Sequence, residues 1–565
     1  MLSSLRCVMG LLFIIHAAVS QAQVAPLHVN ESATDQFGID RKTGRFVLDP
    51  IETISIGGKL GLSLSYYLND SGLVIRQPSF NTSYDYNTLN SLVTIDGFEE
   101  PVTFTGNTTF NSEYVSGATL VKTASGYLYT NRQGVVVEST SNGVITIRYP
   151  DGRTTVYGYQ YVANNLGFMI KSNSGSYAVN QTKDYCIVDS TTVCNNLGGN
   201  RIAAATSVSS GTFSLPDASG GITKIRGSLL PAKMWHQTSS FSPPDEWVYY
   251  PFGITYPGQV AESVSITNRS SGYETHDDIW VTSLQRDGVA VTYNVVKTLF
   301  GGGGALTPSS TYSLDIKALV SGSQVYESYA VKPSNGFGRS RRTLAWIQDG
   351  LARRTGYLYN ASTEVSGVNL PDGRTVKTEY DARDNVVRSL SQAKAAAGPD
   401  LITSYAYAAS CDAMTQATCN KPISITDPSG NVTDYTYNSM GQILTETKPA
   451  SGGVRPKTTN VYAMRTAFTK GAGGVIVAAG APISLIARSS LCKSQASCSG
   501  SSDEVVTIYD YGPATGLTNL SLMGVGVIAT NGQGVMETRW TCYQYNYFGE
   551  IISKTQPNAG ITVCP

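Results

Sequence analysis

Histidine and charged residues are scarce in this chain of 565 residues, which has 4 histidines and only 15% charged residues. The 41 basic residues equal the 41 acidic residues, so the formal net charge is zero. Nucleic acids and anionic membranes favour basic surfaces, because cationic side chains displace their counterions. The charge balance therefore argues against nucleic acid as a partner.

The scarcity of histidine leaves few candidates for acid–base or metal chemistry. Apart from His16 in the N-terminal apolar run, only His28, His236 and His276 occur, far apart in the sequence. His276 is followed by two aspartates and could ligate a cation or act as a base beside an orienting carboxylate. A histidine beside acids in a strand is usually structural, and no nucleophile elbow, phosphate loop or calcium loop accompanies it. We expect no catalytic, metal or cofactor site.

Long hydrophobic runs are also rare. The N-terminal run Cys7–Val19 follows a short basic segment and precedes the small-residue end Ser20-Gln-Ala22. It is shorter than the ~20 residues that cross a bilayer, and this arrangement is typical of a signal peptide over residues 1–22. The alternative is an uncleaved anchor. We predict cleavage between Ala22 and Gln23, export to the periplasm, cell surface or extracellular space, and no later membrane span.

Cysteines occur in close pairs. Without Cys7, eight remain, and an even number in an exported chain predicts disulfides that close short loops. Zinc is the alternative, but neither its Cys-x2-4-Cys spacing nor clustered histidine is present. The sequence does not fix the connectivity. The local pairing would join Cys186 to Cys194, Cys411 to Cys419, Cys492 to Cys498 and Cys542 to Cys564.

Glycine and tyrosine are abundant, with 56 and 34 residues. Strand-like runs separated by turns predict an all-β fold of antiparallel hairpins. In a strand, both tyrosines of a Tyr-x-Tyr pair face the same side, so such rows favour packing between strands. A platform that stacks sugars or bases is the alternative. The pairs lie at 84/86, 127/129, 157/159, 357/359, 405/407, 435/437, 509/511 and 543/545.

A hairpin repeat is visible between Asp427 and Pro449. Asp427-Pro-Ser-Gly430 has the residues of a tight turn, because proline fixes φ and glycine accepts a positive φ. Asn438-Ser-Met-Gly441 is a second turn of the same kind. The strand between them carries a tyrosine face with Tyr435 and Tyr437.

The spacing of this hairpin recurs. Seven residues separate glycine from tyrosine in Gly430 to Tyr437, Gly373 to Tyr380 and Gly152 to Tyr159. Four residues separate tyrosine from glycine in Tyr437 to Gly441 and Tyr545 to Gly549, whereas Asp384 and Asn385 follow Tyr380. The spacing therefore predicts a repeated structural unit.

Tyr-Asp/Asn-x-x-Gly-x-[Ile/Val] alternating with Asp-Pro-x-Gly-Asn or Pro-Asp-Gly-Arg resembles the YD-repeat (RHS-repeat) family, most specifically from Leu370 to Pro565. The resemblance implies β-hairpins wound into part of a large hollow shell, which in bacterial members often encloses a C-terminal toxin. Related shells occur in animal cell-adhesion proteins. No toxin or cleavage segment follows the repeats here, so we expect the N-terminal portion of such a shell, completed by further repeats or another polypeptide.

We expect a β region with early repeats over 23–161, an all-β region over 162–340 that could be a separate sandwich, and YD-type repeats over 341–565. A hairpin is predicted across Arg286-Asp-Gly288, and a short helix over Ser391–Ala397. The functional hypothesis is an exported, non-enzymatic scaffold that encloses or presents another polypeptide. The alternatives are a cell-surface adhesin or glycan-binding protein, and an unrecognised secreted hydrolase.

Overall fold

The computed structural model describes residues 35–42, most of 51–180, the strands between 201 and 332, and most of 343–564, with short gaps inside these ranges. All its labelled elements are β-strands, so the predicted all-β fold is confirmed. Among these residues, no helix is long and apolar enough to cross a bilayer. The predicted signal peptide and the Cys186–Cys194 pair lie outside them.

The largest sheet contains 23 strands, and most of its strands pair antiparallel with their neighbours in the sequence. In hydrogen-bonded order they are β17 (Gly211–Pro216), β18 (Ile222–Gly227), β21 (Phe252–Thr255), β22 (Glu262–Val264), β24 (Ser283–Arg286), β25 (Val289–Phe300), β26 (Thr311–Val320), β27 (Ser323–Lys332), β28 (Thr343–Asp349), β29 (Arg354–Tyr359), β30 (Val365–Asn369), β31 (Thr375–Tyr380), β32 (Val386–Ser391), β33 (Leu401–Ala406), β34 (Ser424–Thr426), β35 (Val432–Tyr437), β36 (Ile443–Thr447), β37 (Lys457–Arg465), β40 (Ile483–Cys492), β41 (Glu504–Asp510), β42 (Gly524–Thr530), β43 (Met536–Tyr545) and β44 (Ile551–Lys554).

A second sheet has nine strands, again in sequence order. They are β8 (Thr119–Lys122), β9 (Gly126–Thr130), β10 (Val136–Thr140), β11 (Ile145–Arg148), β12 (Thr154–Gly158), β13 (Tyr161–Asn164), β14 (Met169–Asn173), β15 (Ser176–Asn180) and β16 (Arg201–Ala205). Four small sheets contain β1 (Ile51–Ile56), β2 (Leu62–Asn69) and β3 (Gly72–Ile75); β4 (Ser79–Asp85), β5 (Asn90–Asp96), β6 (Val102–Gly106) and β7 (Asn111–Ser112); β19 (Ala232–Met234), β20 (Asp245–Tyr249) and β23 (Thr267–Ser271); and β38 (Phe468–Lys470) with β39 (Ile476–Ala478).

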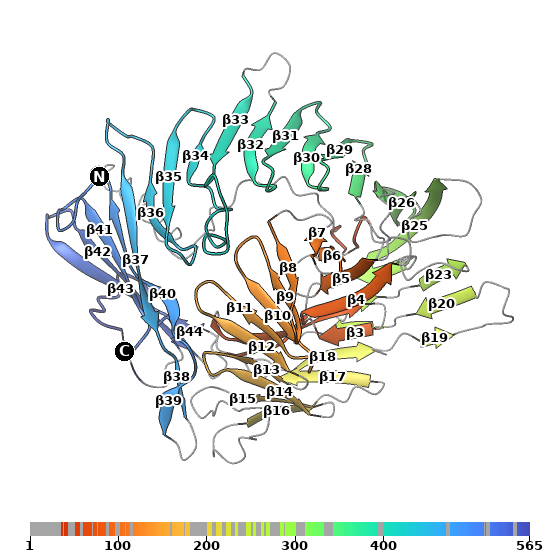
Figure 1. Cartoon of the computed structure of the whole chain (residues 1–565), viewed down its shortest axis with the longest axis horizontal. Coiled ribbons are helices and arrows are strands. Elements are labelled where there is room, and N and C mark those ends of the chain that lie inside the picture. The colour runs from red at the N-terminus through yellow and green to blue at the C-terminus, as the bar shows by residue number, and fades with distance from the viewer. Residues whose placement is uncertain are drawn as a thin grey trace.

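The long sheet curves around the nine-stranded sheet. In Figure 1, the strands from β25 through β37 and β40 to β43, here called the arc, pass from green through cyan to blue around the orange strands β8 to β13. Sheets twist because L-residues favour right-handed strands, and a sheet of many short hairpins therefore curls instead of remaining flat. The arrangement places two parts of the chain that are distant in sequence next to each other.

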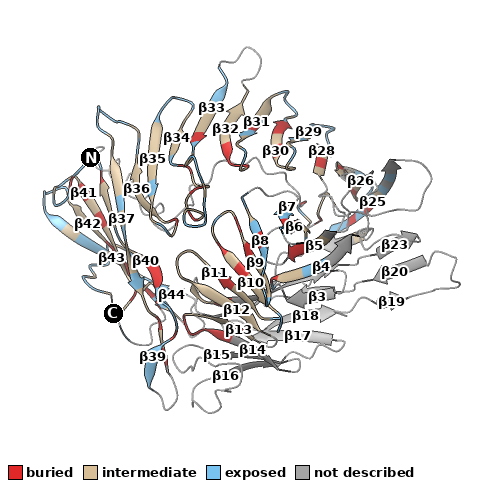
Figure 2. Ribbon diagram, viewed as in Figure 1, coloured by how far each residue is buried: buried red, intermediate tan, exposed pale blue. Residues whose placement is uncertain are grey.

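Burial differs between the two sheets, as Figure 2 shows. Strands β9 and β10 of the nine-stranded sheet pack with β6 of a small sheet in an apolar cluster that includes Phe104, Tyr129 and Val137, each at most 2% exposed. In the arc, strands such as β35 and β36 consist mainly of half-buried residues. The earlier strands of the arc do have fully buried side chains, such as Ile316 and Ala318 within β26. The part of the arc around β35 and β36 therefore differs from them in having no fully buried face.

The described strands bear on three expectations for local structure. The long sheet runs from β17 past the expected boundary at 340/341, and the division of the chain into regions stays a prediction. Ser391 ends strand β32 instead of starting a helix, and residues 393–398 lie outside the described part. The hairpin across Arg286-Asp-Gly288 is present as β24 and β25.

Candidate functional site

One turn design closes hairpins in both large sheets. In it the Oδ1 atom of an aspartate or asparagine accepts the backbone N–H of the residue four positions later, and the fourth residue of the turn has a positive φ. At Asp427, Oδ1 accepts the N–H groups of Ser429 and Asn431 at 2.8 and 2.9 Å, and Gly430 has a φ of 81°. The first residues of the turns are Asn131, Asn164, Asp349, Asn360, Asp381, Asp427, Asn438 and Asn531.

The design explains the residue types at the repeat-defining positions. Glycine is favoured at the fourth position because it adopts a positive φ without steric cost. Gly152, Gly373 and Gly441 have φ values of 91°, 83° and 76°. Asp384 takes the glycine position after Tyr380 with a φ of 56°, which short polar side chains tolerate. Tyr159 and Gly549 lie outside the described residues.

The repeat tyrosines fasten each strand to the one before it. The hydroxyl of Tyr437 donates to the carbonyl oxygen of Pro422 at 2.7 Å, and that of Tyr380 to Val365 at 2.8 Å. Burial raises the pKa of Tyr380 to about 12, with nearby carboxylates adding to it. The remaining bonds of this type join Tyr359 to Leu344, Tyr407 to Val386, Tyr462 to Ile443 and Tyr545 to Leu522.

An irregularity in strand pairing accompanies most of these tyrosine bonds. Between Thr436 and Tyr437 the register shifts, because Leu444 of the next strand is an extra residue with no partner. The same shift precedes Tyr359, Tyr380, Tyr462 and Tyr545. A β-bulge bends its strand and redirects side chains. The bulge is a repeated feature of the hairpin that the sequence analysis did not find.

The turns of the arc form two rims with different surroundings. The outer rim, residues 349–353, 370–374 and 427–431, is open: a Cβ atom added at Gly373 or Gly430 would have no neighbour within 4 Å. The inner rim, residues 360–364, 381–385 and 438–442, includes the buried Asn385. A Cβ atom added at Gly441 would lie 2.3 Å from the carbonyl oxygen of Ala417. The inner rim therefore packs against another segment.

That segment is the clasp, residues 411–421, which connects β33 to β34 and is closed by the Cys411–Cys419 disulfide. Asp412 starts it by accepting the N–H groups of Met414 and Thr415 at 2.9 Å, and these bonds lower its pKa. Turns centred on Thr415 and Thr418 then bring the chain to Lys421. The loop has no hydrophobic periodicity, so local turns and the disulfide determine its shape.

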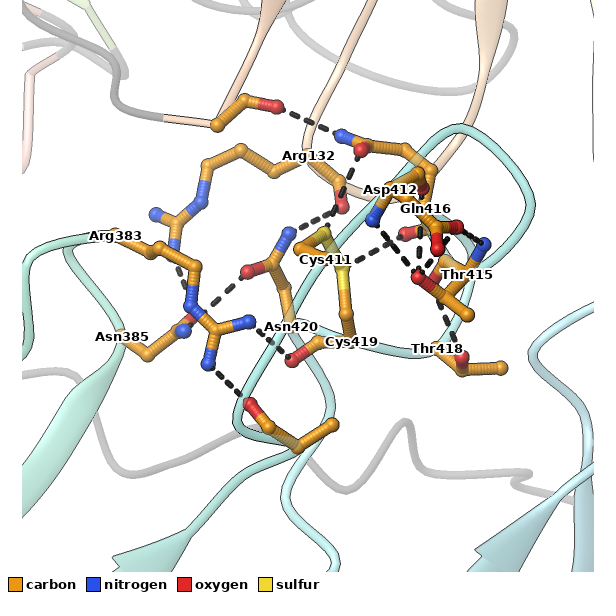
Figure 3. Close-up of a disulfide and its surroundings, with 12 residues drawn as sticks. Arg132, Arg383, Asn385, Cys411, Asp412, Thr415, Gln416, Thr418, Cys419 and Asn420 are labelled. Carbon is orange, nitrogen blue, oxygen red and sulfur yellow. Dashed lines mark hydrogen bonds between the residues drawn. A yellow bond between two sulfur atoms is a disulfide. The ribbon is translucent and has the colours of Figure 1, made fainter.

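The clasp binds the nine-stranded sheet with its amide side chains (Figure 3). The Nε2 atom of Gln416 donates to the carbonyl oxygens of Gly117 and Asn131 at 2.7 and 3.0 Å. The Nδ2 atom of Asn420 donates to the carbonyl oxygen of Arg132 at 2.9 Å. These bonds attach the clasp to the β9–β10 turn at Asn131 and Arg132 and to the segment before β8 at Gly117.

Two arginines connect the inner rim to the β9–β10 turn and to the clasp. Arg132 of the β9–β10 turn donates to Oδ1 of Asn385 at 2.7 Å. Arg383 of the rim donates to the carbonyl oxygens of Cys419 and Ala408 at 3.3 and 2.6 Å (Figure 3). Asn385 also donates to Oδ1 of Asn420 at 3.3 Å. The turn, the rim and the clasp thus share one polar network.

Ala417 lies at the centre of this junction. A Cβ atom at Gly134 would lie 3.1 Å from its nitrogen, and one at Gly441 would meet its carbonyl oxygen. Lys421 donates to the carbonyl oxygen of Gly441, and its ammonium group lies 5.7 Å from the centroid of the Tyr437 ring. Burial lowers the pKa of Lys421. Two glycine turns, one from each sheet, therefore both pack against Ala417 of the clasp.

A second contact between the sheets is apolar and is here called the apolar junction. Leu166 and Phe168, beside the β13–β14 turn, pack with Ala467, Ala479 and Ile483 around the β38–β39 hairpin. Its polar margin contains bonds from Asn165 to Ala481 at 3.1 Å and from Ser484 to Asp151 at 2.8 Å. This contact buries side chains that are at most 4% exposed.

A third contact involves residues 35–42, here called the N-terminal strap. Asp35 folds the strap locally, because its Oδ1 atom accepts hydrogen bonds from the N–H groups of Phe37 and Ile39 at 2.8 Å. Its other oxygen accepts the hydroxyl of Tyr293 in β25 at 3.1 Å. Burial, followed by the charge of Asp35, raises the pKa of Tyr293. The N-terminal strap is thus anchored to the arc.

The other predicted site residues are distributed as follows. Cys492 is bonded to Cys498 and Cys542 to Cys564, at S–S distances of 2.04 and 1.99 Å. His28, His236 and His276 lie outside the described part of the chain. Within that part, no group of three or more histidines, cysteines or acidic residues is arranged to hold a metal ion. The residues brought together here are therefore those of turns and strand contacts.

Comparison with known proteins identifies one repeat. Residues 420–453 match the family model described as RHS Repeat, and no curated protein matches the chain. A crystal structure of TcdB2-TccC3 without its hypervariable C-terminal region is similar at 9% identity and a TM-score of 0.25, over 87% of this chain and 30% of that one. A crystal structure of TcdB2-TccC3-Cdc42 is similar at 10% identity and a TM-score of 0.24, over 83% and 31%.

This chain thus spans about a third of the length of the solved chains that it matches. At these TM-scores the similarity carries no argument about the chain. The family model, in contrast, covers the Asp427 turn, Tyr437 and Gly441, which are the residues that define the hairpin. The resemblance drawn from tyrosine and glycine spacing is confirmed over residues 420–453, which form an RHS repeat.

Proposed function

We propose that this chain is an exported, non-enzymatic scaffold whose hairpins form part of a β-shell that encloses or presents another polypeptide. The observation that carries the proposal is the arc, in which turns and tyrosines of one design repeat along a continuous sheet. Each hairpin supports the next, so the wall can extend without a second covering layer. The RHS repeat at 420–453 supports the same reading.

The half-buried faces of the arc also support a wall. An ordinary sheet buries one face against another layer. Strands β35 and β36 instead keep both sets of alternating side chains partly exposed. A wall of this kind can meet solvent on one side and a contained polypeptide on the other. The half-buried tyrosines use their hydroxyls for strand contacts, which favours packing over a glycan-stacking surface.

Purification of the full chain from its host under non-reducing conditions would test this proposal. We expect a second polypeptide to copurify and to resist added protease until the shell is denatured, with both masses measured by native mass spectrometry. N-terminal sequencing should find Gln23 as the first residue. A chain that carries no polypeptide and hydrolyses a peptide, ester or glycoside, with loss of that activity in His276→Ala, would contradict the scaffold.

A further inference from the structure

The disulfide of the clasp occupies an unusual position, because it controls a loop whose side chains join two sheets. Cys411 and Cys419 are eight residues apart, and the residues between them include Gln416 and Ala417. The side-chain nitrogen of Gln416 donates hydrogen bonds to the carbonyl oxygens of Gly117 and Asn131. The loop is short and polar, so no apolar core of its own fixes these side chains.

The two sulfur atoms differ in access. Cys419 is fully buried, whereas Cys411 is half-buried and is followed by exposed residues, among them Met414 at 86% exposed. A reagent from solution would therefore reach Cys411 first. The carbonyl oxygen of Cys419 accepts a bond from Arg383, so Cys419 also forms part of the polar network.

We propose that the clasp is a thiol-sensitive lock: reduction of the Cys411–Cys419 disulfide releases the β9–β10 turn of the nine-stranded sheet from the clasp. The turn then keeps its direct Arg132–Asn385 bond to the inner rim but loses the additional support of the clasp. Among the described residues, the clasp contacts that turn through the side-chain amides of Gln416 and Asn420 and through Ala417. Without the cross-link, residues 411–421 regain conformational freedom, and three bonds from two side chains then have to form at a greater entropic cost.

The chemistry needs only a dithiol reductant. Its thiolate attacks Sγ of Cys411 and forms a mixed disulfide, and the thiolate of Cys419 leaves and is protonated. The second thiolate of the reductant then attacks its own sulfur in the mixed disulfide and releases Cys411. The reductant becomes a cyclic disulfide and the protein gains two thiols, so two electrons are transferred.

Release at the clasp does not separate the sheets completely. The apolar junction is formed by buried side chains around Phe168 and Ile483 and contains no cysteine. It would remain after reduction and act as the point about which the sheets move. The lock concerns how the two sheets are held together, whether or not the scaffold encloses a polypeptide.

Hydrogen–deuterium exchange of the full chain, read by mass spectrometry, tests this proposal. The reporter is segment 127–137, which contains the turn held by the clasp, and the internal control is segment 161–169 at the apolar junction. Dithiothreitol serves as the dithiol. We expect exchange in 127–137 to become about tenfold faster on reduction while exchange in 161–169 stays unchanged, as for local opening.

Three variants identify the bond responsible. Cys411→Ser with Cys419→Ser should show the fast exchange without reductant, and so should Gln416→Ala with Asn420→Ala in the oxidised state. Cys492→Ser with Cys498→Ser is the matched control, because it opens a loop of similar length on the same sheet. It should leave exchange in 127–137 slow.

The proposal is overturned if reduction loosens only residues 411–421 and leaves 127–137 protected. It is equally overturned if 127–137 and 161–169 lose protection together, since that is general unfolding. If the Cys411→Ser, Cys419→Ser chain fails to fold, two other samples still test the proposal. These are the folded parent titrated with dithiothreitol and the oxidised Gln416→Ala, Asn420→Ala chain.

Discussion

The side-chain nitrogen of Gln416 lies 2.7 Å from the carbonyl oxygen of Gly117, a residue 299 positions earlier in the chain. This bond joins the clasp to the nine-stranded sheet, and Arg132 makes a comparable bond back to Asn385 of the inner rim. A wall of hairpins is thus held at one rim by polar contacts of long sequence separation. Variants at the rims and in the clasp can separate the stability that comes from these contacts from the stability of the repeated hairpin itself.

Two turn glycines with the same backbone conformation should respond differently to alanine. Gly430→Ala places a methyl group in open space at a φ of 81°, so we expect a loss of about 1 to 2 kcal/mol from backbone strain alone. Gly441→Ala adds a clash with Ala417, so we expect about 2 to 4 kcal/mol. Urea denaturation measures both. Equal losses would show that the inner rim is not packed against the clasp.

The hydroxyl of Tyr437 should contribute separately from its ring. Tyr437→Phe removes the bond to Pro422 and should cost about 1 kcal/mol, whereas Tyr437→Ala should cost about 2 to 4 kcal/mol because the half-buried ring is also lost. Tyr435→Phe is the control, since its hydroxyl has no hydrogen bond to any described residue. Thermal or urea unfolding gives the values. A Tyr437→Phe chain as stable as the parent would remove the strand-fastening role.

Asp381 should make stability depend on pH. Burial alone would raise the pKa of this carboxyl group, but hydrogen bonds from Asn385 and Arg383 outweigh burial and hold the pKa below its usual value. The carboxylate therefore stabilises the folded state above the unfolded pKa of about 3.9, and this contribution is lost as the pH falls through the folded pKa. Asp381→Asn keeps a side-chain oxygen that can accept the hydrogen bonds of the turn but removes the negative charge.

The stability difference between the parent and Asp381→Asn should accordingly be largest near neutral pH and should shrink below about pH 4. Urea midpoints measured over this range test it, with Asp372→Asn on the open outer rim as the control. A difference that grows on acidification would mean that the folded pKa of Asp381 is raised.

All eight cysteines outside the predicted signal peptide should be oxidised. Peptide mapping without reductant should find Cys411 linked to Cys419, Cys492 to Cys498 and Cys542 to Cys564, as the structure pairs them. The pair Cys186–Cys194 remains a prediction of the sequence. Titration of the denatured chain should find no free thiol. Eight reactive thiols with bound zinc would refute the disulfides.

The sequence predicted the hairpin well because its determinants are local. Turn residues with positive φ and the interval from Gly430 to Tyr437 follow from backbone sterics and strand geometry, so they are readable without knowledge of the fold. The RHS match over 420–453 covers the same residues. The register shift before Tyr437 was missed, because a bulge depends on how the next strand pairs and has no fixed residue signature.

The sequence predicted the disulfide of the clasp but not the partners of its amide side chains, and the reason is physical. Cysteine spacing indicated the Cys411–Cys419 disulfide, since loop closure is local. The partners of Gln416 and Asn420 are backbone carbonyls nearly 300 residues away. Every residue type has a backbone carbonyl, so the sequence does not show which of them accepts such a bond. The crowded glycines 134 and 441 look identical in sequence to the open glycine 430. Only tertiary structure separates a turn that packs from one that faces solvent.

Cryo-electron microscopy of the particle purified from its host under oxidising conditions tests the central claim most directly. We expect the arc of hairpins curved around the nine-stranded sheet, the clasp closed between them, and density for a second polypeptide against the inner face of the wall. A particle in which the arc encloses only its own side chains, or in which a bound small substrate lies beside His276, would contradict the scaffold account.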